Sequence, residues 1–391
     1  MNLKASIRHA LLFAAAAFVP TTVAVAATFV STVIASGLNK PRGLAFGSDG
    51  ALYVAESGFF SVGGPTTVIR GNVFHYNTSG SITRVANGIQ QRVVTGLASI
   101  SSAANETNGP QDIVFGTNGT GYVLMGLGGD PALRAADLAP GGANLGQLLS
   151  FRPGAPAAFA DVAAYEGANN PTGGSIDSNP FHATALPDGF LVTDAGSNTL
   201  LKVATNGTVS LVAALPGRNI GGGFPSDTVP TGVAIGPDGN YYVAELTGFP
   251  FTSGAARIYR ITPGGNVSVA YTGFTNIGDI AFGTDGTLFV LEVDSNGLAT
   301  PGGSGSLIQV STDGTREIIY SLGLVTPTGL EIGPDGALYV ANFSAVAGIG
   351  QVLRLAAPVP ESATWAMMIT GFGIVGVAMR RRRRTAARAV H

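Results

Sequence analysis

The feature that most constrains this chain is a short pattern that occurs six times between residues 43 and 340. Each copy starts with a small or polar residue, continues with alternating apolar residues, and reaches a turn before a second apolar run. Every turn contains Asp-Gly or Asn-Gly, and both pairs favour tight hairpins because their residues accept positive φ. Each copy therefore predicts a β-hairpin. The copies are residues 43–54, 112–123, 182–192, 232–243, 279–290 and 329–340.

A second hairpin follows most copies, so that one unit contains four short strands. Residues 200–203 and 208–212 form such a pair, as do 258–261 with 267–270, and 307–310 with 316–320. Four-stranded units of roughly 40–50 residues are typical of propeller blades. The first two units are longer, and their extra residues fall in loops. The repeats predict an all-β fold, a six-bladed β-propeller over residues 27–357.

The sixth unit supplies only three strands, at 330–332, 337–341 and 351–355. We expect the missing outer strand to come from residues 28–34, which precede the first unit. A strand from one end of the chain that completes the blade at the other end removes an open sheet edge. Two separate sandwich domains are the alternative, but they would leave an unpaired strand at each end.

The composition excludes several classes of protein. Only 11% of the 391 residues are charged, which argues against a coiled coil or a charged disordered chain. The chain has no cysteine, so disulfides and thiolate metal sites are excluded. Basic residues are concentrated at both ends, and the region between carries a net charge of about −9. This charge disfavours nucleic acid and is compatible with cations or neutral polysaccharide.

The N-terminus has the three parts of a secretory signal. Lys4 and Arg8 provide positive charge, residues 10–19 are apolar, and Ala24-Val25-Ala26 offers a cleavage site. We therefore predict that residues 1–26 are a signal peptide, removed by signal peptidase, and that the protein is exported. A buried N-terminal helix is the alternative.

The C-terminus resembles a membrane anchor. Residues 363–379 are apolar, and as a helix they would extend about 26 Å, near the lower limit for a membrane span. Trp365 would lie at one interface, and the arginines from Arg380 to Arg384 would stay in the cytoplasm. We predict a single transmembrane helix within residues 358–384 and a disordered end over 385–391. The propeller would then be held at the outer side of the inner membrane.

The same segment resembles the PEP-CTERM sorting domain of Gram-negative bacteria, through Pro360-Glu361, residues 364–369, residues 371–373 and the arginine run. The resemblance implies processing by an exosortase-type enzyme, association with exopolysaccharide, and a final place in the cell envelope or outside the cell. Ser362 stands where the family usually has a second proline, so cleavage and a plain anchor both stay open. The sorting residues would be Val359, Pro360, Glu361, Trp365, Arg380, Arg381 and Arg382.

Over residues 28–357 the chain resembles the ScyD/ScyE family of propeller-like proteins, and its short repeats resemble NHL repeats. Residues 37–46, 165–171 and 177–180 carry the first resemblance. It implies the fold and export rather than an activity.

Long connections in the predicted propeller all lie on one face, where binding residues are usually found. We expect function on that face or in the mouth of the channel. One residue per blade begins the first strand there, and another ends the second strand. Carboxylates and one imidazole among them could hold Ca²⁺ or another divalent cation. The alternative is that they hydrogen-bond loop amides. The metal candidates are Asp112, His182, Asp279, Glu56 and Glu245.

The sequence favours an exported, non-catalytic binding or scaffold protein of the cell envelope or extracellular matrix. The alternative is a metal-dependent hydrolase of lactonase or esterase type, with a cation in the propeller mouth. We find no Ser-His-Asp arrangement and no phosphate-binding loop in a strand-to-helix context. The ligand and the oligomeric state are not determined by the sequence.

Overall fold

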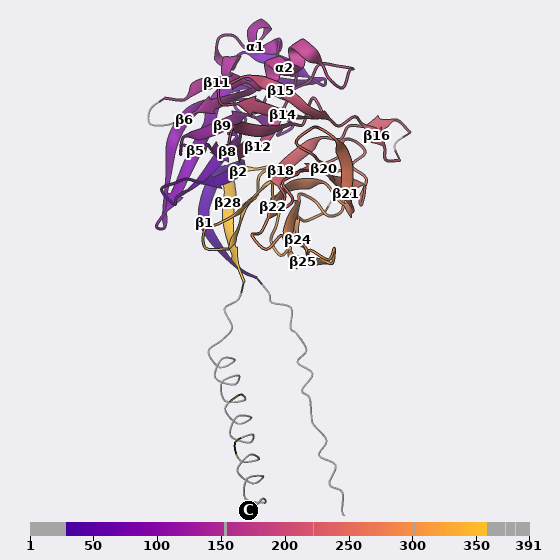
Figure 1. Cartoon of the computed structure of the whole chain (residues 1–391). Helices are drawn as coiled ribbons and strands as arrows, with labels where there is room; N and C mark the ends of the chain where they lie inside the picture. Colours follow the sequence, from indigo (N-terminus) through magenta and orange to yellow (C-terminus); the bar gives the residue numbers. More distant parts are fainter. Residues whose placement is uncertain are drawn as a thin grey trace, which may run out of the picture.

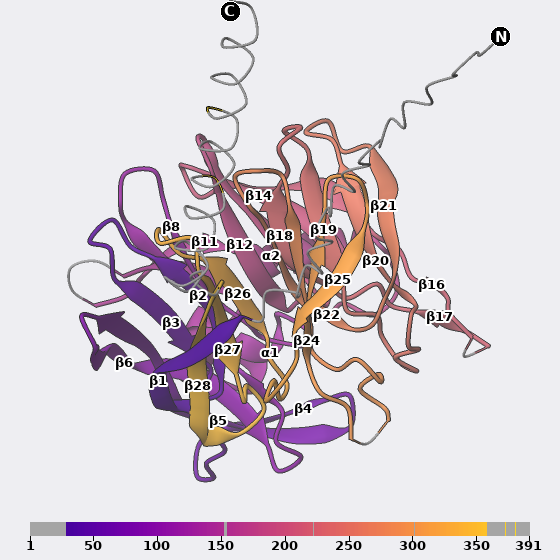
Figure 2. The ribbon, with the colours of Figure 1, turned by 90° about the horizontal axis from the view of Figure 1, so that it is seen from below.

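The computed structural model describes residues 29–357, except 152–154, 222 and 301, together with the single positions Phe372 and Arg380. Its six larger sheets are arranged around a central axis (Figure 2). Each sheet is antiparallel, and four of its strands follow one another from the axis outward. The prediction of an all-β, six-bladed propeller is therefore confirmed.

The blades follow one another in chain order, and the first named strand of each lies nearest the axis. Blade 1 contains β2 (Pro41–Phe46), β3 (Leu52–Glu56), β5 (Asn72–Ala86) and β6 (Ile89–Ser102), with β4 (Thr66–Ile69) beside β5 and β7 (Thr107–Asn108) beside β6. Blade 2 contains β8 (Pro110–Phe115), β9 (Gly121–Met125), β10 (Gln147–Ser150) and β11 (Ala157–Asp161). Blade 3 contains β12 (Pro180–Leu186), β13 (Gly189–Asp194), β14 (Thr199–Ala204) and β15 (Val209–Ala214).

The second half of the propeller repeats this order. Blade 4 contains β18 (Pro230–Ile235), β19 (Tyr241–Glu245), β20 (Ala256–Ile261) and β21 (Val267–Phe274). Blade 5 contains β22 (Ile277–Phe282), β23 (Leu288–Glu292), β24 (Ser306–Val310) and β25 (Arg316–Tyr320). Blade 6 contains β26 (Gly329–Ile332), β27 (Leu338–Asn342), β28 (Ala347–Ala356) and β1 (Val30–Asn39). The loops hold α1 (Leu133–Ala136), η1 (Gly141–Asn144), α2 (Val162–Asn169) and the hairpin β16 (Arg218–Asn219) with β17 (Pro225–Ser226).

The expected closure is present, because β1 pairs antiparallel with β28 and completes blade 6. The pairing runs from Val30 opposite Ala356 to Asn39 opposite Ala347. β1 is longer than the strand predicted at 28–34. β28 begins at Ala347, before the predicted start at 351, and it pairs with β1 as far as Asn39. This arrangement joins the two ends of the propeller through main-chain hydrogen bonds in a chain without disulfides.

The core lies between neighbouring blades, where the faces of adjacent sheets pack together. At the junction of blades 6 and 1, Leu38, Val54, Tyr339 and Val352 belong to one buried cluster. The second strands β3, β9 and β27 are buried along their whole length, because a neighbouring blade covers each face of the sheet. This burial explains why the second half of each sequence repeat is a continuous apolar run.

The two faces of the propeller differ. The long-loop face holds the connections at 57–65, 126–146, 162–179 and 215–229, including α1 and α2. The tight-turn face holds the Asp-Gly turns between first and second strands. Leu338, which follows one such turn, pairs with Leu355 near the end of β28. The start of β1 and the end of β28 therefore lie on the tight-turn face, opposite α1 and α2 (Figure 1).

The predicted signal peptide (1–26), the sorting and transmembrane segment (358–384) and the end (385–391) lie outside the described residues, apart from Phe372 and Arg380. Val359, Pro360, Glu361, Trp365, Arg381 and Arg382 are among them. In the part of the chain that the structure describes, no helix has the length and apolar character needed to cross a membrane.

Candidate functional site: the central channel

The first strands of the six blades surround a cavity of about 1050 Å³ on the propeller axis. It extends from Asp112 and His182 to the turns 283–285 and 333–336, whose tips are exposed, so it opens on the tight-turn face. Its width comes from small side chains, such as Ala234 and Ala281, at positions where the strands face the axis. We expected function on the long-loop face or in the channel mouth. The wide opening of this cavity lies on the tight-turn face, and the location of function stays a prediction.

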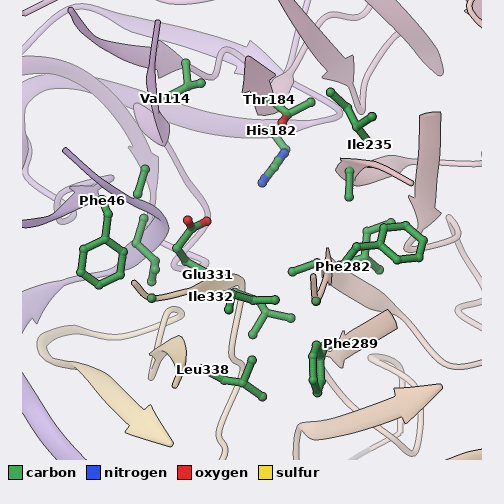
Figure 3. A pocket seen from close by; sticks show the side chains of 18 of the residues that line it. Phe46, Val114, His182, Thr184, Ile235, Phe282, Phe289, Glu331, Ile332 and Leu338 are labelled. Carbon is green, nitrogen blue, oxygen red and sulfur yellow. The ribbon is translucent and has the colours of Figure 1, made fainter. Parts of the chain in front are cut away.

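The cavity has apolar walls and a polar inner end. Phe46, Phe282 and Phe289 lie around it, whereas His182 and Glu331 point into it (Figure 3). A cavity of this size lies above the usual range for small-molecule sites, and apolar walls with few convergent polar groups are typical of such sites.

The structure brings three of the five predicted metal ligands together at the inner end of this cavity. His182 Nε2 lies 3.4 Å from Asp279 Oδ1 and 3.7 Å from Asp112 Oδ2. The three residues are the third residues of the first strands of blades 3, 5 and 2, so they approach the axis from three directions. Both carboxylates are buried.

These three side chains also connect neighbouring blades. Asp112 accepts hydrogen bonds from the amides of Ile113 and Ala183, each at 2.8 Å, and thereby joins blade 2 to blade 3. Asp279 makes the equivalent pair with Ile280 and Leu330, also at 2.8 Å, and joins blade 5 to blade 6.

His182 completes this set of links. The amide of Val233 donates to His182 Nδ1 at 3.4 Å, which joins blade 3 to blade 4. Because Nδ1 accepts, the proton of the neutral imidazole lies on Nε2, facing the carboxylates. Buried amides need such partners, so the inner-end side chains have a structural role whatever else they do.

The first position of the repeat is glycine in three blades and Asp or His in the other three, and packing at the axis explains this difference. A Cβ at Gly43 would collide with the carboxylate of Asp112, and a Cβ at Gly232 would collide with that of Asp279. The Asp side chain of one blade thus occupies the space left by the glycine of the preceding blade. The pattern that predicted a hairpin also encodes how the blades meet at the axis.

Burial dominates the electrostatics of the inner end. It raises the pKa of Asp112 to about 6 and also raises the pKa of Asp279. Burial lowers the pKa of His182, but Asp112, Asp279 and Glu331 outweigh it and the net shift is upward. Burial, with Asp279 and Asp112 nearby, raises the pKa of Glu331 to about 8. Near neutral pH the protonated Glu331 is therefore a hydrogen-bond donor that faces the cavity.

Glu331 did not feature among the predicted site residues, although the repeat contains a signal for it. The equivalent position in the other blades is Ala45, Val114, Thr184, Ala234 or Ala281. An acidic residue at a position that is otherwise small or apolar marks blade 6 as the blade that places a carboxyl group at this level of the channel wall.

The other two candidates, Glu56 and Glu245, are held away from this cluster by arginines. The buried Glu56 carboxylate accepts hydrogen bonds from Arg92 (2.8 and 2.9 Å), from Thr83 Oγ1 (2.6 Å) and from the amide of Asn39 (2.7 Å). Glu245 forms an ion pair with Arg218 at 2.7 Å.

A common structural role explains why an acceptor ends the second strand in several blades. Each accepts the amide of a residue just before the first strand of its own blade, and so fixes the connection that enters the blade. The bonds are Glu56 with Asn39, Asp194 with Asn179, Glu292 with Thr275, and Asn342 with Val325. Within the described ranges, no group of three or more His, Asp and Glu side chains is arranged to hold a metal ion. The predicted cation site stays a prediction.

Comparisons with known proteins identify the fold. No family model matches the chain, and no curated protein sequence matches it. A structural genomics protein of unknown function from Bacteroides thetaiotaomicron is 10% identical, with a TM-score of 0.52, and the match covers 83% of this chain and 75% of that one. A gluconolactonase from Xanthomonas campestris is 10% identical, with a TM-score of 0.50 and coverage of 86% and 94%. The calcium-binding protein regucalcin from Agrobacterium tumefaciens is 13% identical, with a TM-score of 0.50 and coverage of 84% and 96%.

The shared feature is an NHL-like, six-bladed β-propeller. At these identities the likeness establishes the fold and leaves the activity open.

Proposed function

We propose that this protein is an exported, non-catalytic β-propeller of the ScyD/ScyE type, which acts as a binding or scaffold protein in the cell envelope or extracellular matrix. The observation that carries the proposal is the use of Asp112, His182 and Asp279 as links between blades. Side chains that resemble a catalytic set are engaged in holding the first strands together. The signal peptide and the PEP-CTERM-like tail would deliver the protein.

The position of the chain ends supports a direction for binding. Both described ends lie on the tight-turn face, so an anchor within 358–384 would hold that face toward the membrane. The long-loop face would then point into the matrix.

That face carries exposed aromatic rings in blade 4. Phe224 and Phe249 are 50% and 61% exposed, and their rings stack with centroids 6.2 Å apart and planes 7° apart. Phe251 packs edge-on against Phe249. Exposed aromatic groups mark interaction sites, and flat rings suit the apolar C–H faces of sugars. Together with the net negative charge of the central region, they favour a neutral exopolysaccharide as partner.

Retention of the full-length protein on isolated exopolysaccharide tests this function. We expect Phe249→Ala to reduce retention at least fivefold, because one face of the stacked pair is lost. Ile318→Ala is the matched control, since Ile318 is 63% exposed on the outer strand β25 and should not contribute. Absence of retention in the unmodified protein would refute the carbohydrate partner.

A metal-dependent lactonase or esterase is the second candidate. It is favoured by the convergence of Asp112, His182 and Asp279 at the end of the cavity, and by the gluconolactonase and calcium-binding proteins among similar folds. The donor set fits a cation only in part, because each carboxylate oxygen and His182 Nδ1 already accepts an amide.

Elemental analysis after dialysis, followed by an ester and lactone screen, tests the second candidate. One equivalent of metal per chain, lost together with turnover in His182→Ala, would establish the hydrolase. Turnover that is unchanged in His182→Ala would eliminate it.

A further inference from the structure

The connection from β11 to β12 contains the motif segments 165–171 and 177–180, which the central channel does not use. It begins with α2, whose first turn is capped by Asp161, which accepts the amide of Ala164 at 3.0 Å. The helix ends at Asn169 and is followed by the C-cap residue Asn170, which has a left-handed backbone with φ of 39°. An irregular loop then leads to Asp177 and β12.

Three side-chain oxygens in this connection are buried without a hydrogen-bond partner. They are Glu166 Oε2, Asn170 Oδ1 and Asp177 Oδ1. Glu166 is only 1% exposed, although it carries a carboxyl group. Buried polar atoms are normally paired with protein, water or an ion, and an unpaired buried carboxylate is strongly unfavourable. Three such oxygens on one short segment therefore indicate a missing positive partner.

Hydrogen bonds hold the segment in one arrangement. The amide of Asn170 donates to the main-chain oxygen of Glu166 at 2.9 Å, and Asn170 Nδ2 donates to the main-chain oxygen of Gly174 at 3.0 Å. Thr172 Oγ1 donates to the main-chain oxygen of Ser197 at 3.0 Å. The loop thus folds back on the end of α2, and Asp177 lies close enough to the Glu166 carboxyl group to add to the rise of its pKa.

Negative charge exceeds positive charge around this place. Asp177 forms an ion pair with Arg70 at 2.6 Å, but Arg70 is mostly exposed, and the pair uses Asp177 Oδ2 rather than the unpartnered Oδ1. Burial raises the pKa of Asp194, and Asp177 adds to that rise; Asp194 in turn adds to the rise of the pKa of Glu166. Burial first, and these carboxylates second, raise the pKa of Glu166 to about 7.

We propose that this loop binds Ca²⁺ through Glu166, Asn170 and Asp177. The donors are two carboxylates and one amide carbonyl, all oxygen, on irregular backbone; this combination suits Ca²⁺ and lacks the nitrogen and sulfur donors of transition-metal sites. Asp194 supplies charge rather than a ligand, because its oxygens accept Ser178 Oγ and main-chain amides.

The site would fasten three blades together on the long-loop face. Asp177 is paired with Arg70 of blade 1, and the adjacent Ser178 bridges to Gly129 in the long loop of blade 2. The loop itself leads into blade 3. An ion at Glu166 would therefore order the face that we propose for ligand binding, without touching the central cavity.

Thermal unfolding of the full-length protein in EDTA and in CaCl₂ tests this site. At free Ca²⁺ a hundredfold above Kd, we expect the Tm to rise by about 4 °C. Glu166→Gln should abolish the rise, yet it should be at least as stable as the unmodified protein in EDTA, because it removes an unpaired buried charge. Glu317→Gln, on the exposed strand β25, is the matched control and should keep the full rise.

Isothermal titration with CaCl₂ provides a direct count of ions. We expect one Ca²⁺ per chain, lost in Glu166→Gln and in Asp177→Asn; the second variant serves if the first does not fold. An equal rise in Tm for Glu166→Gln and the unmodified protein would overturn the assignment, as would the absence of heat in the unmodified protein.

Discussion

Glu331 offers a quantitative test of the electrostatics of the channel. Its folded-state pKa is raised from 4.5 to about 8, first by burial and then by Asp279 and Asp112. A carboxyl group whose pKa is raised by folding binds its proton more tightly in the folded state. Its contribution to stability is complete below about pH 4.5 and is lost progressively until the pH passes about 8. Glu331→Gln replaces this group by one that does not titrate.

The magnitude follows from the pKa shift and from the surroundings of the side chain. At 1.36 kcal/mol for each pKa unit, the full shift corresponds to about 5 kcal/mol. The side chain faces a cavity that opens to solvent, and water there screens its charge, so we expect about 2 kcal/mol. A propeller of about 330 residues has an unfolding entropy near 0.7 kcal/mol per kelvin, so the Tm changes by about 3 °C.

The assay is calorimetry of the unmodified protein, Glu331→Gln and Glu317→Gln at pH 5 and pH 8.5. We expect the Tm of the unmodified protein to fall more between these pH values than that of Glu331→Gln, by about 3 °C. Glu317→Gln should behave as the unmodified protein does. An identical fall in the unmodified protein and Glu331→Gln would refute the raised pKa and the role of burial behind it.

Two further predictions concern how the blades are held. Gly43→Ala should lower the free energy of unfolding by about 3 kcal/mol, because the new Cβ collides with Asp112. Gly264→Ala is the control, since a Cβ there meets no crowding, and it should change the free energy of unfolding by less than about 0.5 kcal/mol. Chemical unfolding measures both. Arg92→Ala should cost about 2–3 kcal/mol because it leaves the buried Glu56 without its cation, and adding Glu56→Gln should recover at least half of that loss. No recovery in the double variant would mean that Arg92 acts through packing alone.

The architecture could be predicted because its signals are local. Asp-Gly turns and period-two alternation determine each hairpin, and counting the strands of the sixth unit shows that the N-terminal strand must close it. The site was harder to predict, because its partners are distant in sequence. Asp112 accepts the amide of Ala183, 71 positions away, and Arg92 pairs with Glu56 across 36 positions.

The repeat pattern places the residues that begin the first strands, but it does not reveal which of them are already engaged. The five predicted ligands occupy two sets of positions with different roles. Those in the first strands link blades at the axis, whereas those at the ends of the second strands hold connecting segments. The direction in which the cavity opens also escaped prediction, since it depends on how side-chain sizes combine across six blades. In the connection from β11 to β12, the motif was visible in the sequence, whereas the unpartnered oxygens appear only after the loop has folded over α2.

The closure of blade 6 has a mechanical consequence. β28 runs between the two faces and is bonded along its length to β27 on one side and to β1 on the other. A pull between the C-terminal end of β28 and the long-loop face acts along the strand, so both rows of hydrogen bonds bear the load together. A pull that separates Val30 from Ala356 opens the β1–β28 pair from one end, one bond after another. The β1–β28 pair is thus strong against tension across the propeller and weak against a force that separates the two strands from their ends.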